Sequence, residues 1–311
     1  MSELIDVLRR LTGDPPDLRT IDSLDAWWTT HQSARTGFAT SIAAAFAGGF
    51  AADRLGYAFA SGYTEALGAL VPSLRGVKAA LCATEKGSAH PRSIETTLEP
   101  IEDRFRLQGS KSFVTLGDAA EELLVVASAG LDDHERNRLK VVRIPRNRDG
   151  VRLEALPPTP FVPEIPHAKL ILEGARVAAD EVLEGDGYET YLKPFRTVED
   201  IHVHAALVGW LLKVGRRHGW RRETLEDLAQ LASALFPLAL VDPLDAAVHV
   251  TLGGILRRTR AIVNALDWSI VDPETGARFE RDKALLNVAS KARESRLETA
   301  WARLGRVSLI A

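Results

Sequence analysis

Two carboxylates and two imidazoles stand close together near residue 200. Glu199, Asp200, His202 and His204 carry side chains of the types that serve as general acids, general bases or metal ligands. If this segment is helical, residues two positions apart point about 200° apart, so the two imidazoles lie on different faces. No second group of candidate ligands accompanies them in the sequence. We therefore expect no metal site, and Glu199 with His202 and Asp200 with His204 could pair on single faces of the helix.

A second segment, Gly109-Ser110-Lys111-Ser112, combines glycine, hydroxyls and lysine in the manner of a phosphate-binding loop. A Walker A loop needs glycine where Arg104 stands, and it needs the second glycine directly before the lysine. Here Ser110 separates Gly109 from Lys111. The chain also has no G-x-G-x-x-G sequence, so neither common type of nucleotide-binding turn is predicted.

Composition limits the classes of protein further. The chain has 311 residues, 46% of them hydrophobic and 26% charged, which is typical of a globular protein with one large domain or several smaller ones. A net charge of −3 argues against nucleic acid as the main partner. Cys82 is the only cysteine, so no disulfide framework exists, and we expect a small core residue in a protein of the reducing cytoplasm. The longest apolar runs are shorter than the roughly 18–20 residues that span a bilayer, so no membrane association is expected.

The hydrophobic pattern divides the chain into three zones. Residues 1–79 have helical spacing, with a helix beginning at Leu24 behind a cap at Asp22 or Ser23, and two or three helices over 40–70 joined near Gly56 or Gly62. The middle zone alternates at period two in seven short runs: 77–83, 105–108, 111–115, 123–129, 139–144, 151–156 and 168–172. The last zone is helical again, in segments 199–218, 224–241, 244–267 and 279–304.

These zones predict an α+β multidomain protein. We expect an N-terminal helical domain over 1–79, a central antiparallel β-barrel over 80–187 and a C-terminal four-helix bundle over 188–311. The Gly109-Ser110 pair is interpreted as a turn between two strands of the barrel.

Three motifs in this part of the chain resemble those of the acyl-CoA dehydrogenase family. The family's sequences are roughly C-x-T-E-P-G-x-G-S-D, N-G-x-K-x-W-I-T-N and V-R-V-P-x-x-x-x-L-G-x-x-G. The matching stretches here are Cys82-Ala83-Thr84-Glu85-Lys86-Gly87, then Gly109-Ser110-Lys111-Ser112-Phe113-Val114-Thr115, then Ala175-Arg176-Val177-Ala178 followed by Leu183-Glu184-Gly185-Asp186-Gly187. The order of helical, β and helical domains is also that of the family.

The resemblance implies a flavin site. In the family the first two motifs line the isoalloxazine ring of FAD, where hydroxyls polarise the ring and an aromatic side chain packs against it. Carried over by position, the cofactor-binding residues would be Thr84, Ser88, His90, Phe113, Val114 and Thr115. Among these, Thr84 and Thr115 supply hydroxyls, and Phe113 stands where the family has Trp.

Several features depart from the family pattern. Ala89, His90 and Pro91 replace the Gly-Ser-Asp that seats the FAD pyrophosphate, leaving Ser88 and His90 as the candidates to contact phosphate. No R-x-x-F-G motif follows the first C-terminal helix. Compared with the family, the N-terminal domain is expected to be reduced and the C-terminal domain truncated. FAD is therefore expected to be bound weakly or lost.

The usual catalytic glutamate of the family, on a late C-terminal segment, has no counterpart here. A minority branch, which includes isovaleryl-CoA dehydrogenase-like members, carries the glutamate at the start of the first bundle helix instead. Glu199 stands ten residues before Gly209, as in that branch, although Asp200 replaces the branch's arginine. The resemblance thus assigns Glu199 as the catalytic base. The alternative is a carboxylate that only complements the helix dipole.

Two functions follow from the resemblance. The first is an FAD-dependent oxidoreductase of fatty-acid or lipid metabolism that oxidises an acyl-CoA thioester between its α and β carbons. The second is a non-catalytic or FAD-deficient homologue that acts as a partner subunit or binding protein. The expected assembly is a homodimer, a homotetramer or a hetero-oligomer with a longer acyl-CoA dehydrogenase-like subunit. The sequence leaves the identity of the acyl chain open.

Overall fold

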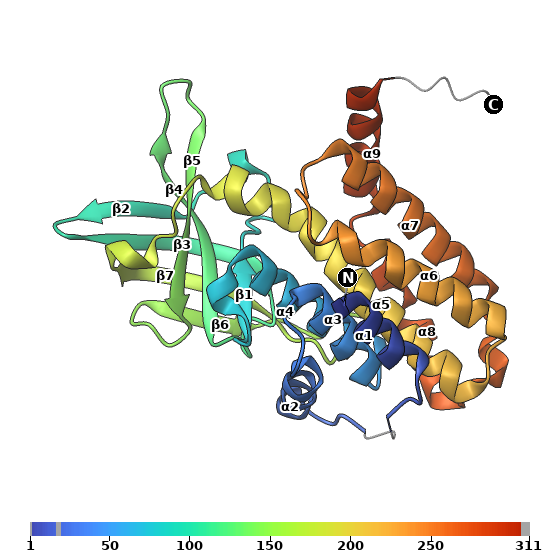
Figure 1. The fold of residues 1–311 in the computed structure, drawn as a ribbon. Coiled ribbons are helices and arrows are strands. Elements are labelled where there is room, and N and C mark those ends of the chain that lie inside the picture. Colours follow the sequence, from blue (N-terminus) through green and yellow to red (C-terminus); the bar gives the residue numbers. More distant parts are fainter. Residues whose placement is uncertain (1, 17–19, 306–311) are drawn as a thin grey trace. The chain divides into compact units, whose positions relative to one another are not determined.

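The structure is a computed structural model that describes residues 2–16 and 20–305. Its described residues form an α+β protein with a curled sheet and a set of packed helices (Figure 1). They divide into two compact units. The helical unit comprises Met1–Ala66, Pro160–Val162 and Thr197–Ala311, and the sheet unit comprises Leu67–Thr159 and Pro163–Arg196. The predicted α+β class is thereby confirmed, whereas the boundaries of the three predicted domains stay a prediction.

The sheet unit is built on one curled sheet with the strand order β1-β4-β2-β3-β7-β6, and β5 pairs with β4. Apolar side chains from successive strands fill the concave side, and Leu107, Val125 and Leu172 are among those with no exposed surface. The bounds of the strands are β1 Ala79–Cys82, β2 Thr97–Ile101, β3 Arg104–Thr115, β4 Glu122–Leu131, β5 Asn137–Pro145, β6 Val151–Ala155 and β7 His167–Val177.

The sheet corrects the prediction of a purely antiparallel barrel. Strand β1 pairs with β4 in parallel, from Ala79 opposite Glu122 to Cys82 opposite Val125. The chain can place these strands in parallel because β2 and β3 intervene between them in sequence, which gives the long connection that a parallel pair requires. The remaining extended pairings, such as β3 with β7 and β4 with β5, are antiparallel as predicted.

The predicted turn at Gly109-Ser110 is wrong, because β3 runs unbroken through both residues. Gly109 has φ of +141°, and a Cβ on it would lie 2.7 Å from the Cα of Thr96. The glycine therefore marks a close approach of two backbones and a neighbouring irregularity of register between Leu107 and Gln108. Strand β2 lies outside the seven predicted strands, and it contains Pro100, a residue that is rare within strands.

A buried ion pair ties β3 to the segment that follows β1. The Lys111 side chain has no exposed surface, and its Nζ lies 2.5 Å from Oε1 of Glu85 and 2.5 Å from the carbonyl oxygen of Val126. The Glu85 carboxylate also accepts hydrogen bonds from the backbone N–H of Glu95 at 2.7 Å and from the hydroxyl of Thr96 at 2.7 Å. Burial opposes ionisation of Glu85, but Lys111 and these donors outweigh it and lower the pKa of the carboxyl.

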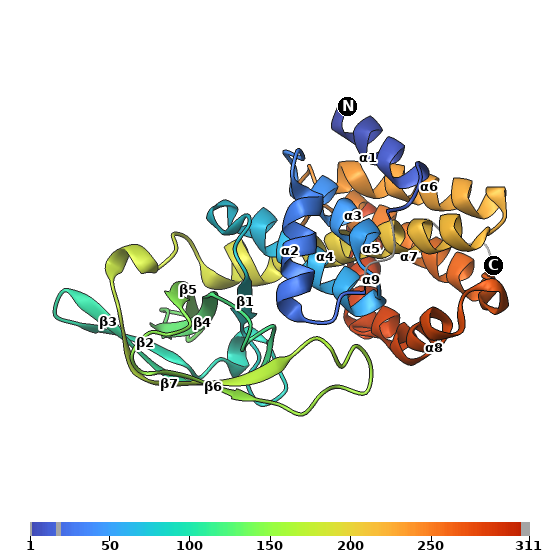
Figure 2. The ribbon, with the colours of Figure 1, turned by 90° about the horizontal axis from the view of Figure 1, so that it is seen from below.

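The helices of the helical unit come from both ends of the chain. Their bounds are α1 Ser2–Thr12, α2 Leu24–Arg35, α3 Ser41–Ala51, α4 Leu55–Leu70, α5 Lys193–His218, α6 Arg222–Leu238, α7 Ala246–Ala265, α8 Pro273–Asp282 and α9 Ser290–Leu304. The end of α4 and the start of α5 are counted with the sheet unit. Figure 2 shows α6 and α7 running side by side, in agreement with their packing. None of the described helices is both long enough and apolar enough to cross a membrane.

Glycines bring α3 and α4 against α5. A Cβ on Gly49 would lie 1.9 Å from the carbonyl oxygen of Ala206, and one on Gly209 would lie 2.4 Å from that of Phe46. Likewise, a Cβ on Gly62 would lie 2.6 Å from the Cα of Val203. No real side chain tolerates such distances, so these helices pack backbone to backbone. The packing fixes where the first turns of α5 stand relative to α4.

The helical predictions hold with three changes. Ser23 caps α2 by accepting from the N–H of Ala26, as predicted. The helices over 40–70 are interrupted at 52–54 rather than at Gly56 or Gly62. The helix predicted over 279–304 is divided, because Ala289 adopts a left-handed φ of +63° directly before α9. The helix predicted over 224–241 ends at Leu238. Closure of the last helices into a four-helix bundle stays a prediction.

We expect the substitution Lys111→Met to destabilise the sheet unit strongly. It would leave the buried Glu85 carboxylate without its counter-charge, which typically costs about 3–5 kcal/mol. The matched control is Arg106→Met on the same strand, whose ion pair with Glu99 is exposed to solvent and therefore contributes little to stability. Free energies of unfolding from urea denaturation measure both effects. Equal losses in the two variants would contradict a special contribution from the buried pair.

Candidate functional site

The ends of β3 and β7 present an exposed aromatic surface in the sheet unit. The Phe113 side chain is 41% exposed, and its ring stacks on that of His167 with 4.2 Å between centroids and 25° between planes. Thr84 lies opposite Phe113 across an isolated bridge, and its carbonyl oxygen accepts from the N–H of Ser112 at 2.8 Å. Thr115 pairs with His167 in the ladder of β3 and β7. We call Thr84, Phe113, Thr115 and His167 the ring face.

Strand alternation explains which predicted residues reach this surface. Phe113 and Thr115 are two positions apart and share one side of β3, whereas Val114 points to the other side. Val114 has no exposed surface and belongs to the hydrophobic core of the sheet. Of the residues predicted for the cofactor, Val114 could therefore contribute only through its main chain.

His167 was missed by the sequence analysis. It is the first residue of β7 and pairs with Thr115 of β3. No local sequence pattern predicts which residues of two distant strands pair, so the sequence alone offered no signal for His167. Its Nδ1 is buried and has no hydrogen-bond partner among the described residues. Burial lowers the pKa of His167, with Asp118 opposing that effect, so the ring is neutral near pH 7. A buried polar atom without a partner is costly and is commonly satisfied by water or a ligand.

The predicted phosphate contacts lie on the turn after β1. Glu85 and Ser88 exchange backbone hydrogen bonds of 2.8 Å, and Lys86 and Gly87 between them both have positive φ, which makes a tight two-residue turn. The Ser88 hydroxyl accepts from the N–H of His90 at 3.1 Å.

His90 itself caps a short helical turn. Its Nδ1 accepts from the N–H of Arg92 at 3.2 Å, which leaves Nε2 of the exposed ring as a donor. His90 and Arg92 both line a pocket of about 920 Å³ in the sheet unit, together with Arg136 and Arg138. His90 can therefore contact a phosphate without a steric clash, and the Ser88 hydroxyl keeps its O–H as a second donor.

The helical unit holds Glu199 in a different pocket, of about 80 Å³. Glu199 is half-buried on α5, and its surroundings are mostly apolar. The apolar walls come from α4, from α5 and from the segment before α9: Leu55, Phe59, Val203, Leu207, Leu285, Leu286, Val288 and Ala289. A carboxyl among apolar walls suits proton transfer, because few competing polar groups are present.

Asp200 does not share the environment of Glu199. Its carboxylate receives the Nε–H of Arg293 at 2.8 Å and a guanidinium N–H of Arg296 at 2.6 Å, both from α9. Asp200 is 5% exposed, so these contacts form a buried charge network. Asp200 thus anchors α9 to α5, and its charge is balanced there.

The two neighbouring histidines face different helices. Nε2 of His202 lies 2.9 Å from the Ser41 hydroxyl on α3, whereas His204 lines a small pocket together with Thr259 of α7 and Arg293 of α9. The described residues contain no cluster of side chains suited to hold a metal ion. Cys82 is fully buried, and burial raises the pKa of its thiol to about 12, so it is a core residue as predicted.

No family model matches the sequence, and no curated protein matches it either. Solved structures do share its fold. Butyryl-CoA dehydrogenase from Megasphaera elsdenii superposes with a TM-score of 0.71 at 17% identity, over 98% of this chain and 99% of that one. The prolyl acyl carrier protein oxidase AnaB gives 0.69 at 17% identity over 98% of both chains. The apo form of PigA gives 0.72 at 14% identity over 98% of this chain and 97% of that one. The chain therefore has the acyl-CoA dehydrogenase fold, as the motifs predicted.

The buried histidines of α5 predict a loss of stability in acid. Burial lowers the pKa of both His202 and His204 to about 4, from 6.5 in an exposed imidazole. Between these values the unfolded chain binds more protons than the folded chain, so stability is full above pH 6.5 and falls as the pH drops toward 4.

Between pH 6.5 and 4, we expect the variant His204→Gln to lose roughly 2–3 kcal/mol less of its free energy of unfolding than the wild type, because one of the two histidine titrations is removed. The control is His134→Gln, whose side chain is exposed between β4 and β5. Free energies of unfolding measured across this pH range give the slopes. An unchanged slope in His204→Gln would contradict a neutral buried imidazole.

Proposed function

We propose that this protein is a flavin-dependent oxidoreductase that removes hydrogen from the α and β carbons of an acyl thioester. The observation that carries the proposal is the ring face, where an exposed Phe113 stacks on His167 beside Thr84. An exposed phenyl ring that stacks on a buried imidazole and is flanked by threonines is suited to a planar heteroaromatic ring. The shared fold supports the same class, since neighbours with this fold include a butyryl-CoA dehydrogenase and an acyl carrier protein oxidase.

The residues of the sheet unit fit the ring end of FAD. Thr84 and Thr115 would donate to or accept from the ring edge, Phe113 would pack on the ring, and the unpartnered Nδ1 of His167 would gain a hydrogen-bond partner. When bound, FAD would supply the acceptor for the hydride that leaves the β carbon. The phosphate end differs from the family, because Ala89, His90 and Pro91 replace its Gly-Ser-Asp. The Ser88 hydroxyl, which accepts from His90 and keeps its O–H, and the exposed His90 ring would be the donors to phosphate. We infer weak binding of FAD.

Glu199 is proposed as the base that takes the α proton. Its apolar pocket excludes much of the water that would compete for the carboxylate, and a hydrocarbon chain could lie along the same walls. Asp200 forms ion pairs with Arg293 and Arg296, so the assignment of the base rests on the position of Glu199 in this pocket and on its place ten residues before Gly209. The volume of this pocket, about 80 Å³, suits a short acyl chain better than a long one.

The altered sequence of the turn after β1, where the family binds the FAD pyrophosphate, supports a second, non-catalytic function. If the altered phosphate seat prevents FAD from binding, the chain would act as a non-catalytic subunit that binds or completes a longer acyl-CoA dehydrogenase-like partner. Leu240 and Val241, 58% and 53% exposed between α6 and α7, would then belong to a subunit interface. Such an interface is also what a homodimer or homotetramer of the catalytic form would use.

We expect the full chain to bind FAD with an affinity that Phe113→Ala weakens roughly three- to tenfold, because stacking contributes about 0.5–1.5 kcal/mol beyond the area it buries. Quenching of flavin fluorescence during titration measures both affinities. The matched control is Trp301→Ala, which removes an aromatic ring of similar exposure from α9. Equal binding by the wild type and Phe113→Ala would contradict the ring face as the flavin site. Absence of binding by the wild type would favour the non-catalytic function.

For the flavin-loaded protein, we expect Glu199→Gln to slow oxidation of the best acyl-CoA substrate about a hundredfold or more, because a positioned base contributes on that order. Rates come from stopped-flow bleaching of the flavin with a panel of straight and branched acyl-CoA thioesters. Glu226→Gln, an exposed carboxylate on α6, is the control. Retention of the rate within a few fold in Glu199→Gln would exclude Glu199 as the base.

A further inference from the structure

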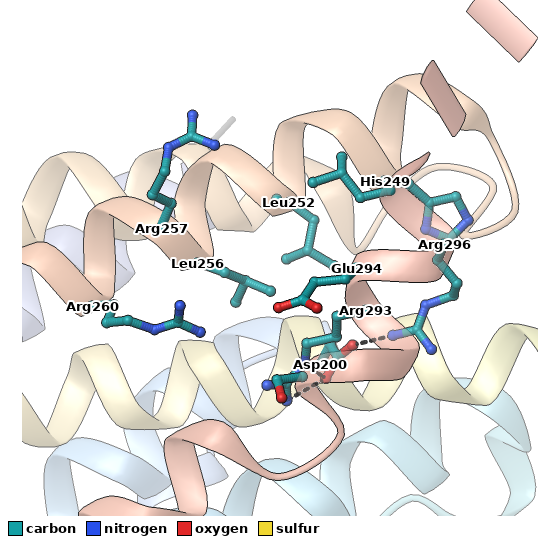
Figure 3. A pocket seen from close by; sticks show the side chains of 12 residues that line it. Asp200, His249, Leu252, Leu256, Arg257, Arg260, Arg293, Glu294 and Arg296 are labelled. Atoms are coloured by element: carbon teal, nitrogen blue, oxygen red, sulfur yellow. Dashed lines mark hydrogen bonds and ion pairs between the residues drawn. The ribbon is translucent and has the colours of Figure 1, made fainter. Parts of the chain in front are cut away.

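A pocket of about 180 Å³ lies among α5, α7 and α9 of the helical unit (Figure 3). Its apolar lining comes from Leu252 and Leu256 on α7 and from Leu297 on α9. A Cβ on Gly253 would lie 3.0 Å from Leu297, so the two helices are in close contact beside the pocket. The volume is smaller than that of typical drug-sized sites of about 300–1,000 Å³. The space therefore suits a small ligand with an apolar part.

The same pocket carries an excess of positive charge. Four guanidinium groups line it, those of Arg257, Arg260, Arg293 and Arg296, against the two carboxylates of Asp200 and Glu294. Two of the four arginines, Arg293 and Arg296, form ion pairs with the Asp200 carboxylate, as the dashed lines in Figure 3 mark.

Arg257 and Arg260 are exposed at the pocket and have no ion pair within residues 2–16 and 20–305. Glu294 is exposed too, and it forms no ion pair in the same part of the chain. At most one carboxylate is thus left against two guanidiniums. By contrast, the adjacent Arg258 is paired with Asp227 at 2.8 Å on the side of α6.

Neighbouring imidazoles experience charges of both signs in this region. Burial lowers the pKa of His204 to about 4, and the charges of Arg293 and Arg260 lower it further. Burial also lowers the pKa of His249 on the pocket wall, with added contributions from Arg296 and Arg303. Asp200 opposes these arginines at both histidines, so the excess of positive charge rests on the arginines that line the pocket and not on the imidazoles.

We propose that this pocket binds a small amphipathic carboxylate. The carboxylate would lie at the guanidinium of Arg260, which points toward Leu256 and Glu294 in Figure 3 and can offer paired N–H donors. Arg257, directed to the outer side of α7, would add positive charge at the rim, and the hydrocarbon part would lie along Leu252, Leu256 and Leu297. The ligand could be a free organic acid or an acyl thioester whose chain ends in a carboxylate, since both present the same chemistry. This proposal is independent of the flavin chemistry proposed above.

Isothermal titration of the full chain with sodium hexanoate tests the site, with 1-hexanol and inorganic phosphate as the two partial ligands. We expect hexanoate to bind at least tenfold more tightly than either, because each partial ligand lacks one of the two kinds of contact. The double variant Arg257→Gln/Arg260→Gln should weaken hexanoate at least tenfold, in line with the loss of charge-assisted hydrogen bonds. The control Arg258→Gln, one position away on α7, should bind hexanoate within twofold of the wild type.

Competition separates the two sources of the carboxylate. Displacement of hexanoate by adipoyl-CoA but not by hexanoyl-CoA would identify a carboxylate-ended acyl chain, and displacement by neither would identify a free acid. Equal affinity for hexanoate and hexanol would overturn the proposal, as would phosphate binding as tightly as hexanoate. Equal effects of the double variant and Arg258→Gln would overturn it as well, and circular dichroism of both variants checks that each is folded.

Discussion

The buried contact between Glu85 and Lys111 is the constraint on which the ring face depends. It joins the turn after β1 to the middle of β3, and no part of the Lys111 side chain reaches solvent. With Lys111 turned into the sheet, the register irregularity between Lys111 and Val114 allows Val114 to point inward too and Phe113 to point out. Thr84, directly before Glu85, is carried to the same place. A single pair thus positions residues from two distant segments.

This pair also changes how the sequence motifs are interpreted. Glu85 and Lys111 are two of the letters by which the chain resembles the acyl-CoA dehydrogenases, yet both act within the fold and not at the ring face. Their presence explains why the fold agrees with the motifs. It bears less on whether FAD is retained, because that depends on Phe113, His167 and the phosphate turn.

Much of the fold could be predicted from the sequence, because the pattern of burial along a strand or helix is a local property. The middle zone was recognised as β structure, and Ser23 was recognised as a helix cap. The errors came from contacts between distant residues. Gly109 resembles a turn in sequence, but it is a glycine because Thr96 approaches it. The parallel pairing of β1 with β4 likewise has no local signal.

The candidate site was predictable to the extent that its residues lie on the motifs. His167 became visible only once β7 was paired with β3, and the role of Asp200 depends on Arg293 and Arg296, far along the chain on α9. Glycines at the contacts of α3 and α4 with α5 set the walls of the Glu199 pocket, and their purpose also appears only in the packed structure.

The most direct test of the proposed function is the absorption spectrum of the FAD-saturated full chain during anaerobic addition of acyl-CoA thioesters. The proposed chemistry predicts that at least one thioester bleaches the visible flavin band and is converted to its α,β-unsaturated product. If no thioester of a broad panel bleaches the band, while dithionite does, the bound flavin is competent but the chain does not oxidise acyl thioesters. That result would contradict the enzymatic function proposed here.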